Sequence, residues 1–128
     1  MSSKPEDTNK QPDNQPAPIP VEYGNREGRY FTQWRIDLLE ELLERIVYNY
    51  DSTPLITVES PKVWYDAEQD FHRLEFRSGG KHFHVQFYKV FTAFVDGEDG
   101  WRGCPRSSMG RFAKYLRDLA RGIKPEGD

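Results

Sequence analysis

Two histidines one residue apart are the clearest candidates for metal chemistry in this sequence. His82 and His84 occupy alternate positions of a predicted strand, so both imidazoles should point to the same face. If the preceding strand pairs across Gly79-Gly80, Glu75 lies opposite His84 on that face. Two imidazoles and a carboxylate are ligands of the kind that zinc accepts. A set of ordinary surface side chains is the simpler interpretation, so no cofactor is expected and the metal or enzyme site stays an alternative.

Positive charge gathers near the C-terminus. Residues 102–124 contain seven cations and one anion, a net charge of +6, although the whole chain carries −3. Several of these cations fall opposite the apolar positions of a predicted helix, so they should face water. Others flank the helix start, where unpaired backbone N–H groups favour an anion. The predicted residues for binding an anion or nucleic acid are Arg102, Arg106, Arg111, Lys114, Arg117 and Arg121.

Acidic residues of an earlier predicted helix offer these cations another partner. Glu40, Glu41 and Glu44 lie on the polar side of that helix. If they neutralise the basic residues, the charge near the C-terminus is no reason to expect an anionic ligand.

Rings and cations also meet on the outward face of a predicted hairpin, where Phe71 and Tyr88 lie near Arg73 and Arg77. Proteins that bind single-stranded nucleic acid stack bases on such faces, at about 1–3 kcal/mol per base. Glu75 interrupts this possible stacking face, and another segment or a second chain could cover its rings.

A protein interface is the third possibility for binding. Phe31, Trp34 and Leu38 widen the apolar side of the first predicted helix beyond what one sheet face needs. They would suit a protein adaptor or a homodimer.

Nucleophilic catalysis has little support. Cys104 lies between Arg102 and Arg106, which could lower the pKa of its thiol, but no histidine is near in sequence. As the single cysteine, it cannot form an intramolecular disulfide. The sequence therefore predicts a non-enzymatic binding module. It is expected to engage an unidentified anionic partner, a nucleic acid or an acidic protein surface, through the basic C-terminal helix and the glycine-rich loop before it. No apolar stretch approaches the ~20 residues that span a bilayer, so no membrane association and a cytoplasmic location are expected.

The elements that position these residues follow from periodicity. Apolar residues at three- and four-residue steps predict helices over residues 31–50, with Thr32 as the N-cap, and from 107 or 108 to 121. Period-two patterns predict strands over 55–59, 63–66, 71–78 and 81–88. Residues 89–95 continue the last strand through a bulge or form another, and 96–110 are expected to be a loop.

The hairpin around Gly79-Gly80 has a predicted register, because a two-residue glycine turn and the apolar pattern agree. The inner-face pairs are Phe76–Phe83, Leu74–Val85 and His72–Phe87. The outer-face pairs are Arg77–His82, Glu75–His84, Arg73–Gln86 and Phe71–Tyr88.

Together these patterns predict an α+β fold. An N-terminal amphipathic helix precedes an antiparallel meander of three to five strands, and a C-terminal amphipathic helix packs on one sheet face. Residues 1–27 hold five of the nine prolines and few apolar residues, so a disordered tail is expected there. Residues 28–124 form the single domain, and 125–128 a disordered C-terminus.

Overall fold

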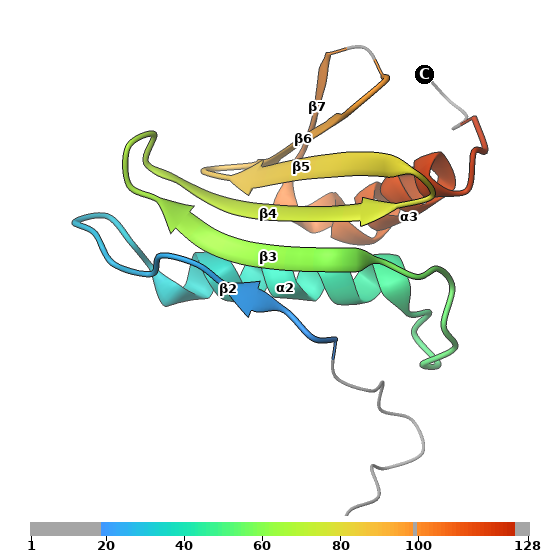
Figure 1. The fold of residues 1–128 in the computed structure, drawn as a ribbon, viewed down its shortest axis with the longest axis horizontal. Helices are drawn as coiled ribbons and strands as arrows, with labels where there is room; N and C mark the ends of the chain where they lie inside the picture. Colours follow the sequence, from blue (N-terminus) through green and yellow to red (C-terminus); the bar gives the residue numbers. More distant parts are fainter. Residues whose placement is uncertain (1–18, 99, 125–128) are drawn as a thin grey trace, which may run out of the picture.

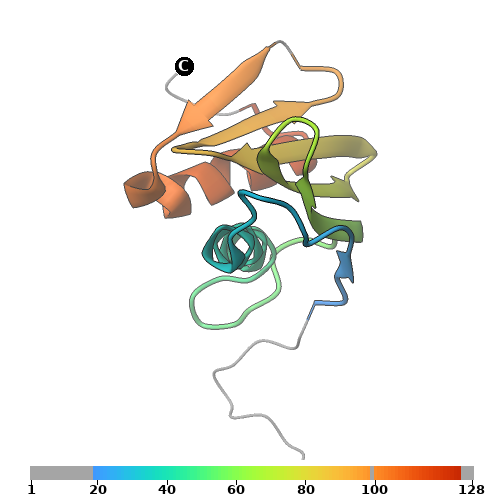
Figure 2. The ribbon, with the colours of Figure 1, turned by 90° about the vertical axis from the view of Figure 1, so that its left-hand side faces the viewer.

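A six-stranded sheet and two helices on one of its faces make up the described part of the chain (Figures 1 and 2). This computed structural model describes residues 19–98 and 100–124. The strands follow one another across the sheet in chain order, and all neighbours are antiparallel except β2 and β3. The α+β class is confirmed. No helix in the described ranges has the length and apolar character needed to cross a membrane.

The elements have the following bounds. The strands are β2 (Glu22–Tyr23), β3 (Glu59–Asp66), β4 (Phe71–Ser78), β5 (Lys81–Phe87), β6 (Phe91–Val95) and β7 (Trp101–Cys104). The helices are α2 (Gln33–Val47) and α3 (Met109–Ala120), and the short 3-10 turn η1 (Arg106–Ser108) leads into α3.

The prediction that a helix comes first is wrong, because strand β2 precedes α2. β2 pairs in parallel with β3, and the Gly24 N–H extends this pairing to the Val63 carbonyl at 3.0 Å. Ile19 and Val21 pack against the core beside it. β2 has only two residues and follows a proline-rich segment, so it shows no periodicity. Its partners in β3 lie far along the chain, so no local pattern indicates this strand. Residues 1–18 and 125–128 of the predicted termini lie outside the described residues.

The prediction of three to five strands is also wrong, since the sheet has six. Residues 91–95 form the separate strand β6, which pairs with β5 after a bend at 88–90. β7 occupies part of the predicted loop, where neighbouring glycines and a proline masked a short strand.

β3 also differs from its prediction. It runs unbroken through Ser60-Pro61, where two strands were expected to be separated. Its register with β4 shifts between Glu59 and Lys62, and Ser60 has a φ of 53°. This irregularity accommodates a proline that has no N–H to donate. Residues 55–58 of the other predicted strand are not part of the sheet.

The predicted hairpin register is confirmed for every pair from Ser78–Lys81 to His72–Phe87. Gly79 and Gly80 have φ values of 60° and 78°, which the primed turns of tight hairpins require. Phe76 and Phe83 stack at 4.7 Å inside the core, so the register places the large rings beneath the helices.

Both helices turn their apolar stripes toward the sheet. α2 buries six apolar side chains, and α3 adds Phe112, Leu116 and Leu119 to the same core. Thr32 is the N-cap of α2, but its side chain makes no capping bond. Instead, its backbone N–H donates to Nε2 of His72 at 3.0 Å. The inward histidine of β4 therefore fastens the start of α2 to the sheet.

Candidate functional site

The sheet face opposite the helices is the candidate site. In Figure 1 this face is turned toward the viewer, with α2 and α3 behind it, and Figure 2 shows both helices on one side of the sheet. The alternation that buries one set of side chains leaves the other set partly exposed across β3 to β7. We call this surface the open face. Its side chains include Trp64, Phe71, Arg73, Glu75, Arg77, His82, His84, Gln86, Thr92, Phe94 and Trp101.

Two pairs of aromatic rings lie on or beside the open face. Phe71 and Tyr88 meet edge to face with centroids 6.2 Å apart, although their predicted strand pair does not form, because β5 ends at Phe87. Phe94 and Trp101 come from β6 and β7 and lie 5.5 Å apart. This second pair was not predicted, because the sequence pattern left one of its strands undecided and placed the other in a loop. Tyr88 and Trp101 are 49% and 55% exposed, so each pair presents one ring to solvent.

A shallow hollow joins the two ring pairs. It has a volume of about 390 Å³, and Phe71 and Trp101 contribute to its lining. Its other lining residues are Gln69, Arg73, Gln86 and Thr92. The hollow therefore combines aromatic surface with amide, hydroxyl and guanidinium groups.

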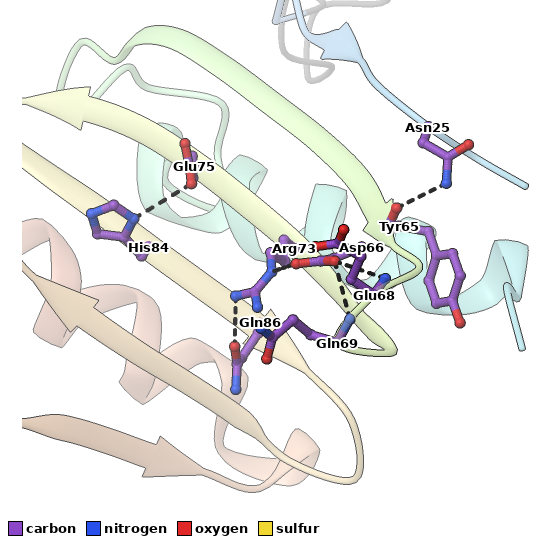
Figure 3. A network of polar contacts seen from close by, with 9 residues as sticks. All are labelled: Asn25, Tyr65, Asp66, Glu68, Gln69, Arg73, Glu75, His84 and Gln86. Atoms are coloured by element: carbon purple, nitrogen blue, oxygen red, sulfur yellow. Dashed lines mark hydrogen bonds and ion pairs between the residues drawn. The ribbon is translucent and has the colours of Figure 1, made fainter. Parts of the chain in front are cut away.

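Arg73 is held in place by a polar network (Figure 3). Its Nε donates to Asp66 at 2.8 Å, and its Nη1 donates to Oε1 of Gln86 at 2.8 Å. Partial burial alone would raise the pKa of Asp66, but the bonds from Arg73 and the Gln69 N–H hold it below its usual value. The network fixes the position of Arg73 and partly neutralises its charge. Arg77, on the same face, is exposed to solvent.

The three residues of the predicted metal site come together on the open face. Glu75 lies opposite His84 in the β4–β5 pairing, and its carboxylate is 3.5 Å from each of the two imidazoles. A fourth member, Asp96, was not predicted, and its Oδ1 is 3.3 Å from Nε2 of His84. Asp96 follows β6 directly, so its position depends on a pairing that the sequence pattern left undecided.

Three of the predicted anion-binding residues bind within the protein. Arg117 donates to the carbonyls of Arg45 and Ile46 at the end of α2, at 2.9 and 3.5 Å. Arg121 donates to the Leu55 carbonyl at 3.1 Å. Lys114 pairs with Asp118 of its own helix at 2.8 Å. Carbonyl groups at the negative end of α2 therefore accept from Arg117, in place of the acidic side chains that the sequence offered as partners.

The other three predicted anion-binding residues differ in their surroundings. The guanidinium of Arg102 lies 4.4 Å above the ring of Tyr115. Arg106 lies 5.5 Å from the ring of Trp34. Arg111 is exposed at the start of α3. The six residues thus differ in how far the protein itself already engages their charge.

The predicted protein interface is largely occupied by intramolecular packing. Phe31 contacts the rings of Tyr65 and His72 at 6.0 and 5.7 Å, and Leu38 packs against the core. Trp34 is 45% exposed, and the guanidinium of Arg35 lies 4.6 Å from its ring. Trp34 is thus the main member of this trio that a partner could reach.

Cys104 is buried, and its thiol lies within hydrogen-bonding distance of the Pro105 and Ser108 carbonyls. Burial raises the pKa of the Cys104 thiol, and Arg111 opposes this effect only in part. We expect a thiol-specific reagent to label native protein at least about tenfold more slowly than urea-unfolded protein, because both access and thiolate are reduced. The labelling is monitored by the absorbance of the group that the reagent releases. Equal labelling rates in native and unfolded protein would contradict the burial of Cys104.

Comparisons with known proteins returned no match: no family model matched the chain, and neither the curated proteins nor the solved structures contained a significant relative.

Proposed function

We propose that this protein is a non-enzymatic binding module for single-stranded nucleic acid and that the open face receives the bases. The observation that carries this proposal is the hollow flanked by Phe71 and Trp101, each of which belongs to a ring pair. Bases of any sequence stack on aromatic rings, and each stacked base contributes about 1–3 kcal/mol.

The polar groups of the hollow support the same ligand. Gln69, Gln86 and Thr92 offer amide and hydroxyl groups that can hydrogen-bond to base edges. Arg77 on the open face and Lys62, whose amine lies 4.7 Å from the ring of Trp64, can approach phosphates. Glu75 and Asp66 balance some of this charge, so stacking should supply more of the affinity than phosphate contacts do.

The basic residues of α3 define a competing surface for the same class of partner. α3 itself lies on the side of the sheet opposite the open face (Figure 2). Variants on the two sides can therefore separate the two binding modes.

The test is fluorescence anisotropy with a labelled oligothymidine and its RNA equivalent at low salt. Phe71→Ala with Trp101→Ala should weaken binding at least about tenfold, because stacked bases lose the two rings that flank the hollow. Arg111→Glu with Lys114→Glu, the matched pair on the helical side, should leave the affinity within about twofold. Circular dichroism checks that each variant folds.

Salt dependence is an independent readout. Two or three phosphate contacts on the open face predict a slope of log K against log salt of about −1.4 to −2. Contacts from the five cations between Arg111 and Lys124, on α3 and just after it, would predict about −3.5. The proposal fails if no oligonucleotide binds at low salt, or if only the α3 variant loses affinity with the steeper slope.

A further inference from the structure

The side chains of Glu75, His82 and His84 converge on the open face at metal-ligand spacing. Oε1 of Glu75 is 3.5 Å from Nε2 of His82, and Oε2 is 3.5 Å from Nδ1 of His84. One ligand atom from each residue lies within 4.8 Å of the other two. Figure 3 shows the Glu75 carboxylate turned toward the imidazole of His84 across the β4–β5 pair.

These separations fit a tetrahedral ion. Zinc lies about 2.0–2.2 Å from nitrogen and oxygen ligands, which puts neighbouring tetrahedral ligands about 3.4 Å apart. The two contacts of Glu75 have this length, but each is made by a different oxygen of its carboxylate, so binding through one oxygen requires the carboxylate to rotate. The ligand atoms of the three residues lie within 4.8 Å of one another, and the tilted imidazoles have centroids 4.1 Å apart, so side-chain rotation must bring the three atoms closer.

Asp96 gives His84 the support that metal-binding histidines usually have. Its carboxylate lies 3.3 Å from Nε2 of His84, the nitrogen that faces away from Glu75. An imidazole that donates Nε2–H to a carboxylate leaves Nδ1 unprotonated and able to bind a metal. The backbone of Asp96 is held beside His82, because its N–H donates to the His82 carbonyl at 3.0 Å.

Neighbouring structure limits how these side chains can move. The ring of Phe94 lies 5.8 Å from that of His84 and holds it from the β6 side. The three side chains retain between 28% and 34% of their accessible surface, so an ion from solvent can reach them. Three protein ligands leave one tetrahedral position for water.

We propose that Glu75, His82 and His84 bind one zinc-type divalent transition-metal ion, with Asp96 orienting His84. This inference is independent of nucleic-acid binding, since it rests on ligand geometry alone.

The test is calorimetric titration of the tag-free, full-length chain, stripped of metal, with zinc. The expected result is one ion per chain, with no comparable binding of magnesium, which prefers oxygen ligands. Asp96→Asn should weaken binding by about 10–100-fold, the usual effect of losing an orienting carboxylate. Glu75→Gln and His84→Ala should weaken it further, whereas Glu68→Gln, a control in the exposed β3–β4 turn, should not change it.

NMR of the histidine rings in the wild-type protein locates the ion without relying on a variant that could alter folding. Zinc should shift the ring resonances of His82 and His84 and leave those of buried His72 unchanged. Absence of saturable binding in about a tenfold excess of zinc overturns the proposal. Undiminished binding in His84→Ala, or shifts that omit His82 and His84, overturn it as well.

Discussion

Replacing Gly79 by alanine should destabilise the fold by about 3–5 kcal/mol, from left-handed strain together with steric overlap. A Cβ built at this position would lie 1.8 Å from the Ala120 carbonyl oxygen, which is backbone and cannot rotate away. Gly79 also has a φ of 60°, a conformation unfavourable for any residue with a Cβ. Either the turn or the end of α3 must move, and both pack against the core.

Gly80→Ala is the matched control in the same turn. Its φ is 78°, but nothing lies within 4 Å of the added Cβ. It should cost only about 1–2 kcal/mol, the strain of the left-handed conformation. Urea unfolding of the two variants and the wild type measures the difference. Equal losses of stability would show that the close approach to Ala120 does not exist.

This turn also shows how far the sequence could predict the fold. A glycine pair between two alternating patterns is enough to predict the register, because turn geometry and side-chain alternation agree. The contact of Gly79 with α3 was not predictable. It depends on how the end of α3, far along the chain, packs against the hairpin. No local sequence pattern near Gly79 indicates this packing.

The missed strands have a common physical cause. β2 has two residues and β7 has four, so neither is long enough to display a period of two. Their strand conformation comes from neighbours in the sheet, which supply hydrogen bonds to segments with little propensity of their own. The second ring pair was missed for this reason, since it needs β7 to pair with β6. Asp96 was missed because the pairing of β6 with β5 was left undecided.

The candidate sites, too, have parts that the sequence could predict and parts that it could not. Alternation along β4 and β5 predicted which side chains share the open face, and the convergence of Glu75, His82 and His84 follows from it. The sequence also indicated which face of α3 is basic. It could not show that Arg117 would reach the carbonyl end of α2, because a backbone acceptor carries no sequence signal.

Acidification should destabilise the protein through His72, by about 2 kcal/mol between pH 7 and pH 5. Burial lowers the pKa of His72 to about 4, and the positive charge of Arg35 adds to this effect while Asp70 opposes it. The unfolded chain, with an ordinary histidine pKa near 6.5, therefore binds the proton first as the pH falls. The contribution of His72 to stability is therefore fully present above about pH 6.5 and is lost progressively toward pH 4.

The neutral imidazole is also what the fold requires. Its Nε2 accepts the Thr32 N–H, and a protonated ring would have no lone pair for that bond. Protonation would thus release the start of α2 as well as bury a charge between Phe31 and Tyr65.

His72→Gln tests this account, because a glutamine oxygen can accept the same N–H but does not titrate. Urea unfolding at several pH values should give the variant a flatter profile between pH 6.5 and pH 5 than the wild type. The difference between the two profiles isolates His72 from His82 and His84, which both proteins retain. Parallel profiles, or an NMR titration of the His72 ring near pH 6.5, would show that its acceptor role does not control stability in acid.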